Sequence, residues 1–200
     1  MKEHLRPAVV LLLLFSVLCG AAYPLAVTGI AQATMPAKAN GSLIKIDGKL
    51  IGSQLIGQTF TTARYFHGRP SAASTAGYDA SASSGSNLGP SSKTLQDRIK
   101  AERAKLAEEN PGAPVPADLL YASASGLDPE ISPEAAHFQL PRVAAARGLG
   151  AADIEPLIAA STTPRGLGLL GEPAVNVLQL NLTVDKLAPL NASVAAPTAP

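Results

Sequence analysis

The sequence predicts an α+β protein with one N-terminal transmembrane helix followed by a small, loop-rich extracytoplasmic α+β domain. Three observations support this fold class. The first is a run without any charged side chain, from Pro7 to Ala37. The second is that helix and strand signals are mixed through the rest of the chain. The third is the composition, because 17 glycines and 17 prolines among 200 residues require many turns.

The first expected element is a transmembrane helix over residues 7–31. Residues Ala8–Ala22 are almost continuously apolar. About 24 residues of helix would reach roughly 36 Å, enough for a hydrocarbon core of about 30 Å with some tilt. Small residues in this segment would allow close packing against another helix. They are Ser16, Gly20, Ala21 and Ala22.

A cleaved signal peptide is the alternative interpretation of this segment. Cleavage after Ala31-Gln32-Ala33 would lie far beyond the apolar run, and cleavage after Gly20-Ala21-Ala22 would meet Tyr23-Pro24. A lipoprotein site at Cys19 would need a small residue before it, and Leu18 stands there. We therefore expect an uncleaved anchor.

The orientation follows from the flanking charges and from the size of the domain. Residues 1–6 contain Lys2, Arg6 and the terminal amine, which favour a cytoplasmic N-terminus. Lys38 and Lys45 at the other end nearly balance them. Long domains are translocated largely regardless of charge. We therefore expect residues 1–6 in the cytoplasm and residues 38–185 outside it.

Residues 42–58 predict a β-hairpin. Asp47-Gly48 separates the apolar runs 43–46 and 49–51, and this dipeptide favours a type I′ turn. Residues 70–90 come next and are rich in Ser, Ala and Gly, a composition typical of a flexible linker.

A helix is expected from Ser91 or Ser92 to about Asn110, because a serine can cap its start and Pro111-Gly112 would end it. Its charged residues lie at i+3 and i+4 spacings, which is typical of a solvated face, with a charged docking surface as the alternative. The apolar stripe of this helix is narrow and consists of Leu95, Ile99 and Leu106. After the helix, residues 115–123 predict a short strand.

Residues 125–136 carry the clearest local signals. Asp128-Pro129 predicts a turn, because proline fixes φ and aspartate bonds to nearby backbone. Ser132-Pro133-Glu134 predicts a helix start, with the serine as N-cap and the proline at the first helical position. This helix should run over 133–147 and end at Gly148, with Pro141 kinking or interrupting it. A further helix should span about 151–160.

Residues 175–185 predict a bulged strand. Apolar residues alternate from Leu178 to Val184, whereas Val175 and Val177 have the opposite parity, and a bulge would explain that shift. Residues 186–200 form an Ala/Pro-rich tail that we expect to be disordered.

Charge, cysteine content and missing motifs exclude several function classes. Sixteen basic and 15 acidic residues, with no basic stripe, argue against nucleic-acid binding. The single cysteine, Cys19, excludes an intramolecular disulfide. The chain has no Walker A sequence, no phosphorylatable aspartate motif and no G-x-S-x-G nucleophile elbow. We therefore expect no catalytic residue and no cofactor of the chain's own.

Gly166, Gly168 and Gly171 form a literal G-x-G-x-x-G. A dinucleotide site requires a strand before this motif and a helix after it. Here helix signals precede the motif and strand signals follow it, so we interpret these residues as turn glycines.

Asp128 and His67 each have a ligand interpretation and a turn interpretation. Asp128 could bind a hard cation together with carbonyls of residues 123–126, whereas an aspartate before proline is more typical of a turn. His67 has no cysteine or second histidine at metal-ligand spacing, and the same holds for His4 and His137. We predict turn roles and no metal site.

Five blocks of sequence occur in the same order as in one known family. On these blocks the chain resembles the C subunit of the bacterial Kdp potassium-transporting P-type ATPase, and the resemblance extends from the apolar segment to about Asp185. It implies that residues 70–90 are an ordered loop, in which Ser84 replaces one of two glycines that would permit close backbone approach. The blocks are YFHGRPSA (65–72), SGSNLGP (84–90), SGLDPEISPEAA (125–136), QLPRVAAARGL (139–149) and GEPAVNVLQLNLTVD (171–185).

The resemblance also implies a location in the inner membrane and a set of partners. These are a potassium-translocating channel-like subunit, a P-type ATPase subunit and a very small membrane peptide subunit, so that the complex handles ATP and potassium. The family is described as a catalytic chaperone that raises the nucleotide affinity of the ATP-hydrolysing subunit. This implies a nucleotide-binding role for Gln139, whose amide could meet a ribose or an adenine edge. A helix-surface glutamine without a special role is the alternative.

We therefore expect a non-catalytic subunit that assembles, stabilises or tunes an ATP-driven potassium importer. The alternative is an independent membrane-anchored periplasmic ligand-binding protein. Co-purification in a stoichiometric complex would indicate the first, and ligand binding without partners would indicate the second.

Overall fold

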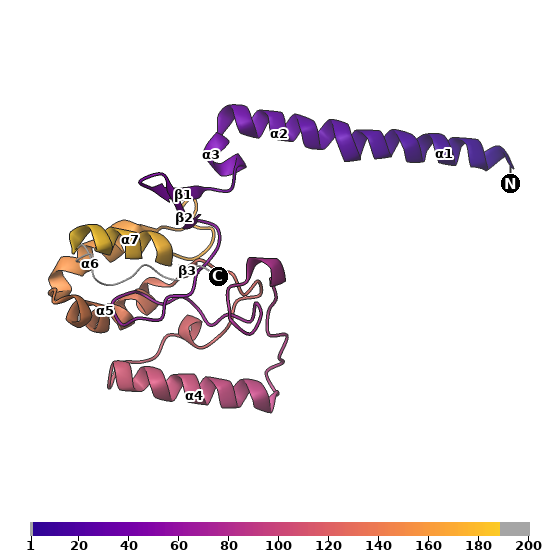
Figure 1. The fold of residues 1–200 in the computed structure, drawn as a ribbon. Helices are drawn as coiled ribbons and strands as arrows, with labels where there is room; N and C mark the ends of the chain where they lie inside the picture. Colours follow the sequence, from indigo (N-terminus) through magenta and orange to yellow (C-terminus); the bar gives the residue numbers. More distant parts are fainter. Residues whose placement is uncertain (1, 189–200) are drawn as a thin grey trace. The chain divides into compact units, whose positions relative to one another are not determined.

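The computed structural model describes residues 2–188 and divides into two compact units, one ending at Ser53 and the other beginning at Gln54. The first unit contains the N-terminal helices and a two-stranded hairpin (Figure 1). The second unit contains the remaining helices and a small sheet. The α+β class predicted from the sequence is confirmed.

The N-terminal helix is continuous through α1 (Lys2–Val17), the π-helical turn η1 (Leu18–Ala22) and α2 (Tyr23–Thr34). Its 32 residues from Glu3 to Thr34 have the length and composition to cross a membrane. They extend beyond the expected segment 7–31 at both ends. The π turn has a local cause, since Pro24 cannot donate to the carbonyl four residues earlier and its ring clashes with it. A short helix, α3 (Pro36–Ala39), follows.

The predicted hairpin is confirmed. Strands β1 (Leu43–Ile46) and β2 (Lys49–Ser53) pair antiparallel, with a register shift between Ile44 and Lys45. Asp47 and Gly48 have φ values of 50° and 77°. Positive φ at both central residues is the geometry of a type I′ turn.

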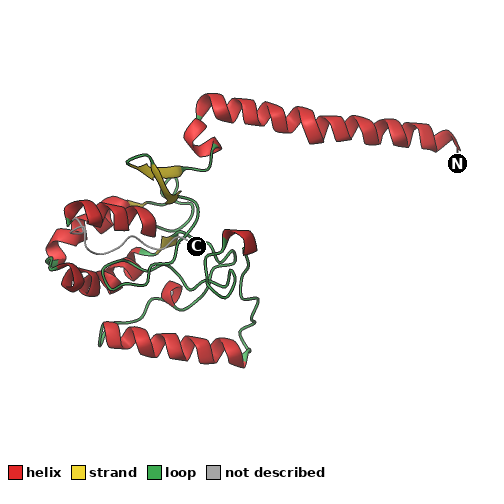
Figure 2. Cartoon of the chain, in the orientation of Figure 1, coloured by secondary structure: helices red, strands yellow, loops and turns green. Residues whose placement is uncertain are grey.

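The second unit is built around a three-stranded antiparallel sheet in the order β3-β5-β4. The strands are short: β3 is Glu130–Ile131, β4 is Thr162–Thr163 and β5 is Ala174–Asn176. Three helices pack on the central strand, namely α5 (Pro133–Arg147), α6 (Ala151–Ser161) and α7 (Val177–Leu187). Figure 2 shows that loops make up most of the chain between β2 and α5.

The core of the second unit is almost entirely aliphatic. Phe66 and Phe138 are its only aromatic members among the described residues. The remaining positions come from the sheet, from the buried faces of α5, α6 and α7, and from Leu106, Leu119 and Leu120 outside these elements. Burial of aliphatic side chains is therefore the main stabilising contribution. The best-buried aliphatic members larger than alanine are Leu120, Ile131, Val143, Ile154, Ile158, Val175, Leu180 and Val184.

The long charged helix is confirmed as α4 (Lys93–Glu109), with Ser92 as its N-cap. Its buried side chains are Leu95 and Leu106. Loop 70–90 contains one short 3₁₀ turn, η2 (Ala80–Ala82).

The strand expected over 115–123 is wrong. The segment forms a 3₁₀ turn, η3 (Ala117–Leu119), directly after Pro116. Leu119 and Leu120 are both buried. Two consecutive buried residues do not fit the alternation of a half-exposed strand. Burial of both leucines therefore favours the 3₁₀ turn over a strand.

Both ends of α5 are confirmed. The Ser132 hydroxyl accepts a hydrogen bond from Ala135 N at 3.0 Å, and Gly148 ends the helix with a φ of 66°. The expected interruption at Pro141 does not occur. A helix-interior proline costs about 3 kcal/mol, and burial of the neighbouring side chains Leu140 and Val143 offsets that cost. The helix expected at 151–160 is confirmed as α6.

The prediction of a bulged strand at 175–185 is correct for residues 175 and 176 and wrong from Val177 onward. Chain 174–176 is β5, and residues from Val177 onward form α7. Asn176 caps this helix by accepting a hydrogen bond from Gln179 N at 3.1 Å. The buried residues Val177, Leu180 and Val184 follow helical spacing, which the alternation from Leu178 to Val184 concealed.

The expected disorder of residues 186–200 falls mainly on residues 189–200, which lie outside the described residues. Lys186 and Leu187 belong to α7.

Candidate functional site

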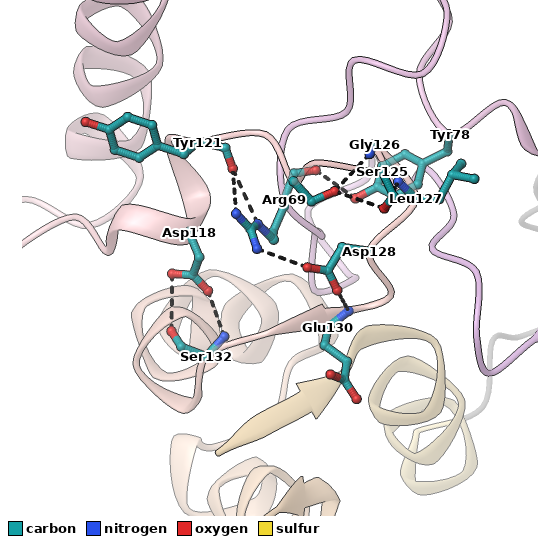
Figure 3. A network of polar contacts seen from close by, with 11 residues as sticks. Arg69, Tyr78, Asp118, Tyr121, Ser125, Gly126, Leu127, Asp128, Glu130 and Ser132 are labelled. Carbon is teal, nitrogen blue, oxygen red and sulfur yellow. Dashed lines mark hydrogen bonds and ion pairs between the residues drawn. The ribbon is translucent and has the colours of Figure 1, made fainter. Parts of the chain in front are cut away.

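Polar contacts concentrate where residues 65–85 meet residues 118–132 (Figure 3). Arg69 lies at the centre of this group. Its guanidinium donates to Asp128 Oδ2 at 3.0 Å and, through Nε and Nη2, to the Tyr121 carbonyl at 3.4 Å. Both side chains of the ion pair are 27% exposed. Arg69 therefore joins two segments that are distant in sequence, at a half-buried position.

Asp128 has the predicted turn role. Its Oδ1 accepts a hydrogen bond from Glu130 N at 3.0 Å, while Oδ2 binds Arg69. Both carboxylate oxygens are thus used within the fold. Burial and the negative charge of Asp128 raise the pKa of Glu130. Among residues 2–188, no group of three or more His, Cys, Asp or Glu side chains is arranged to hold a metal ion.

Asp118 fixes the start of α5 to the same network. Its Oδ2 accepts from Ser132 N at 2.7 Å and its Oδ1 from the Ser132 hydroxyl at 3.2 Å (Figure 3). Because Ser132 is also the N-cap, one serine connects the helix start to the 3₁₀ turn that contains Asp118.

Ser71 and Tyr78 hold the loop that the sequence composition alone would make a flexible linker. The Ser71 hydroxyl donates to the Gly126 carbonyl at 2.6 Å and accepts from Tyr78 N at 2.8 Å. The Tyr78 hydroxyl donates to the Arg69 carbonyl at 2.7 Å. Burial, with a smaller contribution from Asp128, raises the pKa of Tyr78 to about 12.

Glycines allow these loops to approach closely. A Cβ on Gly57 would lie 2.4 Å from the Tyr78 ring and 2.6 Å from the Asp128 carbonyl oxygen. A Cβ on Gly126 would lie 2.5 Å from the Ser84 carbonyl oxygen, and the φ of Gly126 is +67°. A Cβ on Gly85 would lie 2.9 Å from the Ala124 carbonyl oxygen. Close backbone approach is therefore present although Ser84 replaces one glycine of the pair.

A second group of side chains, which we name the clamp, binds the backbone of residues 63–67. Each carbonyl oxygen in this stretch accepts a hydrogen bond from a clamp side chain, over distances of 2.7–3.1 Å. The loop thus gains main-chain hydrogen bonds without belonging to any sheet. The clamp consists of Gln139, Arg142 and Arg147 from α5 and Asn181 from α7.

Asn181 and Arg147 both reach the backbone of this loop with buried side chains. Asn181 accepts from Phe66 N at 2.8 Å and donates to Phe66 O at 2.9 Å, as a neighbouring strand would. The Arg147 side chain is 0% exposed and pairs with Asp185 at 2.8 Å. Its guanidinium also lies 5.0 Å from the centre of the Tyr65 ring, a cation–π contact.

Gln139 is buried, with 2% of its surface exposed, and so is not the helix-surface glutamine considered as the alternative in the sequence analysis. Its Oε1 accepts from His67 N at 2.8 Å and from Arg142 Nη2 at 2.7 Å. Its Nε2 donates to the carbonyls of His67 and Ala135 at 3.1 and 3.2 Å. All donors and acceptors of this amide are therefore engaged inside the domain.

His67 stands beside a cleft of about 190 Å³. Its Nε2 lies 3.0 Å from the Thr62 carbonyl and so carries the proton of the neutral ring. Burial, and then the positive charge of Arg142, lower the pKa of His67. The charged lining is paired, since Lys105 meets Glu102 at 3.6 Å and Glu109 meets Arg142 at 3.0 Å. Polar members of the lining are His67, Arg69, Glu102, Lys105, Glu109 and Gln139.

The three glycines and His137 are not among the residues that line this cleft. Gly166, Gly168 and Gly171 belong to a turn in which Gly166 pairs with Leu170, with φ of 75° at Gly168 and 77° at Gly171. Their interpretation as turn glycines is confirmed. His137 Nε2 lies 2.8 Å from Glu155 Oε1 at the exposed surface.

Sequence reasoning missed three of the four clamp residues, namely Arg142, Arg147 and Asn181. Each lies in one of the family blocks and is polar, yet Arg147 and Asn181 are buried in the fold. A polar residue inside an otherwise apolar helical pattern was the available signal.

Comparisons with known proteins agree over nearly the whole chain. The model of the family described as "K+-transporting ATPase, c chain" matches residues 5–186. The "Potassium-transporting ATPase KdpC subunit" of Caulobacter vibrioides NA1000 / CB15N is 58% identical over 194 residues, covering 96% of this chain and 98% of the relative. The protein of the same name from Rhodopseudomonas palustris BisB5 is 57% identical over 196 residues, covering 92% and 98%. The chain, with its apolar N-terminal helix and its clamped α+β unit, therefore belongs to the KdpC family of potassium-transporting ATPase subunits.

Proposed function

We propose that this protein is a non-catalytic subunit that assembles and stabilises an ATP-driven potassium importer. The observation that carries the proposal is the family match over residues 5–186, which includes both the apolar helix and the clamped domain. The proposed partners are a channel-like potassium-translocating subunit, a P-type ATPase subunit and a very small membrane peptide subunit. Potassium and ATP would be handled by those partners and not by this chain.

The proposed location is the inner membrane, with residues 1–6 in the cytoplasm and the domain outside. The helix from Glu3 to Thr34 would be about 48 Å long, so that it exceeds a hydrocarbon core of about 30 Å. The positive charges of Lys2 and Arg6 support this orientation.

An effect on ATP affinity would be indirect in this arrangement. A bilayer would separate Gln139 from the cytoplasmic ATP pool, and the amide is already engaged by His67, Arg142 and Ala135. We propose that the domain changes nucleotide affinity by favouring one conformation of the pump over another. Gln139 would contribute by holding the clamp together.

The test of complex membership is co-purification of the full chain with its own pump subunits. A tag after the last residue should recover the other subunits at fixed stoichiometry, and deletion of this chain should abolish potassium-stimulated ATP hydrolysis. Recovery of the full chain alone, with specific binding of a small ligand, would instead support the anchored ligand-binding protein.

The nucleotide proposal has its own test in the assembled complex. Gln139→Ala should lower the thermal stability of the complex because it removes the hydrogen bonds to His67. The ATP concentration that gives half-maximal turnover should stay nearly unchanged. A large rise in that concentration, with crosslinking of an azido-ATP probe to this chain in intact membranes, would contradict both the indirect effect and the orientation.

A further inference from the structure

The hairpin of β1 and β2 exposes apolar and basic side chains together on one face. Leu43 and Lys45 lie two residues apart on β1, and Leu50 pairs with Lys45 across the strands, so the three side chains share that face. We name these three residues the hairpin face. Leu43 and Leu50 are 53% and 54% exposed. About half of each leucine is therefore left uncovered by the fold.

The hairpin belongs to the same compact unit as the apolar helix, and an ordered turn joins the two. The side-chain amides of Gln32 and Asn40 exchange two hydrogen bonds, each 3.2 Å long. Asn40 Nδ2 also donates to Pro36 O at 2.7 Å. At the far end of β2, the Ser53 hydroxyl donates to Gly41 O at 2.6 Å. Both ends of the hairpin therefore lie beside the turn that follows the helix.

Gln32 sets the level of this turn relative to the membrane. Since it belongs to α2, its partner Asn40 lies back at the level of the helix end and not beyond it. A hydrocarbon core of about 30 Å takes up about 20 residues of helix. Ile30 is the last large apolar residue of α2, so a core that ends there leaves Thr34 about 6 Å higher, within the headgroup layer. The base of the hairpin then lies in the same layer.

Positive charge surrounds the hairpin face. Lys38, Lys45 and Lys49 stand against a single acidic residue, Asp47, within residues 35–53. Among residues 2–188, none of these lysines takes part in an ion pair. Anionic lipids attract basic side chains that lie next to a membrane-spanning helix. A lysine beside apolar side chains can also extend its ammonium group to the headgroups while its stem stays in apolar surroundings.

We propose that the hairpin face binds the membrane surface, with anionic phospholipid as its partner. Leu43 and Leu50 enter the boundary between headgroups and hydrocarbon, and the Lys45 ammonium group binds lipid phosphate. A lipid surface is favoured over a protein partner because it supplies apolar and negative groups together at the level of the turn. The proposal rests on the membrane location proposed above and adds a second contact with the bilayer, outside the spanning helix.

Tryptophan fluorescence tests the proposal, because the chain contains no tryptophan of its own. Leu50→Trp places the only indole on the hairpin face. Ile46→Trp is the matched control, since Ile46 lies on the opposite face of the same strands and is 39% exposed. Each full-length variant is reconstituted in vesicles of phosphatidylcholine and phosphatidylglycerol, with or without bromine on the acyl chains of the phosphatidylcholine.

The indole of Leu50→Trp should be quenched by the brominated lipid. Acrylamide in the water should quench it about twofold less than the indole of Ile46→Trp, because the headgroup layer shields it. Adding Lys45→Gln to the Leu50→Trp chain should weaken quenching by the brominated lipid. Adding Lys100→Gln, which removes an exposed lysine of α4, should leave that quenching unchanged. Equal acrylamide quenching of the two indoles, or equal effects of the two lysine substitutions, would overturn the proposal.

Flotation separates failure of this proposal from failure of the membrane location. After an alkaline carbonate wash, the wild-type chain and all variants should float with the vesicles, because the spanning helix alone holds them. Loss of flotation by the wild-type chain would defeat the membrane location itself. Normal flotation with a water-exposed indole at position 50 would defeat only the hairpin contact.

A photoreactive side chain identifies the occupant in the assembled pump. Leu50→p-benzoylphenylalanine in intact membranes should form adducts with phospholipid, which mass spectrometry would detect. Adducts with a pump subunit, or no adduct at all, would overturn the lipid contact.

Discussion

At the scale of single residues, Tyr78 couples the loop network to pH. Its pKa is raised to about 12 from the ordinary value of 10.0. Between these pH values the unfolded chain releases the phenolic proton while the folded chain retains it. The stability contribution is therefore complete below pH 10 and is lost as pH rises to 12. At about 1.4 kcal/mol per pKa unit, the loss should approach about 3 kcal/mol.

The measurement is the free energy of unfolding of the full chain in detergent micelles from pH 9 to pH 12, compared with Tyr78→Phe. The variant should be less stable at pH 9 by about 1 kcal/mol, because it loses the hydrogen bond to the Arg69 carbonyl. This difference should shrink and then reverse toward pH 12. Parallel curves would show that Tyr78 does not titrate as argued.

Gly57 provides a second prediction at this scale. Gly57→Ala would bring a methyl group within 2.4 Å of the Tyr78 ring and 2.6 Å of backbone oxygen. Overpacking of this kind costs about 1–3 kcal/mol. Gly89→Ala is the matched control, because nothing lies within 4 Å of its Cβ position. Urea unfolding should separate the two variants, and equal stabilities would be inconsistent with a close approach at Gly57.

At the scale of elements, α5 and α7 hold a loop that has no strand partner. Asn181→Leu should destabilise the second unit by about 2–4 kcal/mol, because the buried N–H and C=O of Phe66 both lose their partner. Hydrogen exchange at the Phe66 amide should accelerate accordingly. Thr183→Ala on the same helix, which loses only a bond within α7, is the control. An unchanged exchange rate in Asn181→Leu would refute the clamp.

The elements also show which parts of the fold could be predicted from sequence. Elements with local signals were predicted, including the hairpin at Asp47-Gly48 and the start of α5 at Ser132. Helix α7 was not, because its apolar residues fit two periodicities and the decision depended on packing against α6 and β5. The clamp was missed because its side chains bind backbone atoms of a loop that is distant in sequence. Every residue has these backbone atoms, so no sequence pattern marks them as hydrogen-bond partners.

At the scale of the whole molecule, the prediction concerns topology. The N-terminal helix should remain attached, so the mature protein should begin at the original N-terminus. An alkaline phosphatase reporter fused after Ala188 should be active, and a fluorescent reporter that matures only in the cytoplasm should be dark there. A mature chain that begins near Thr34 would identify a cleaved signal peptide instead.

The clamp has a consequence for how freely the family sequence can change. The four clamp side chains bind main-chain atoms, so the hydrogen bonds to Ala63 and Arg64 do not involve the side chains of these two residues. A saturation library should therefore accept most residues at these two positions. Proline should be rejected at Phe66 and His67, whose N–H groups donate to the clamp. Tolerance to substitution in this loop should thus depend on which backbone N–H groups are hydrogen-bonded, in addition to the burial of the Phe66 side chain.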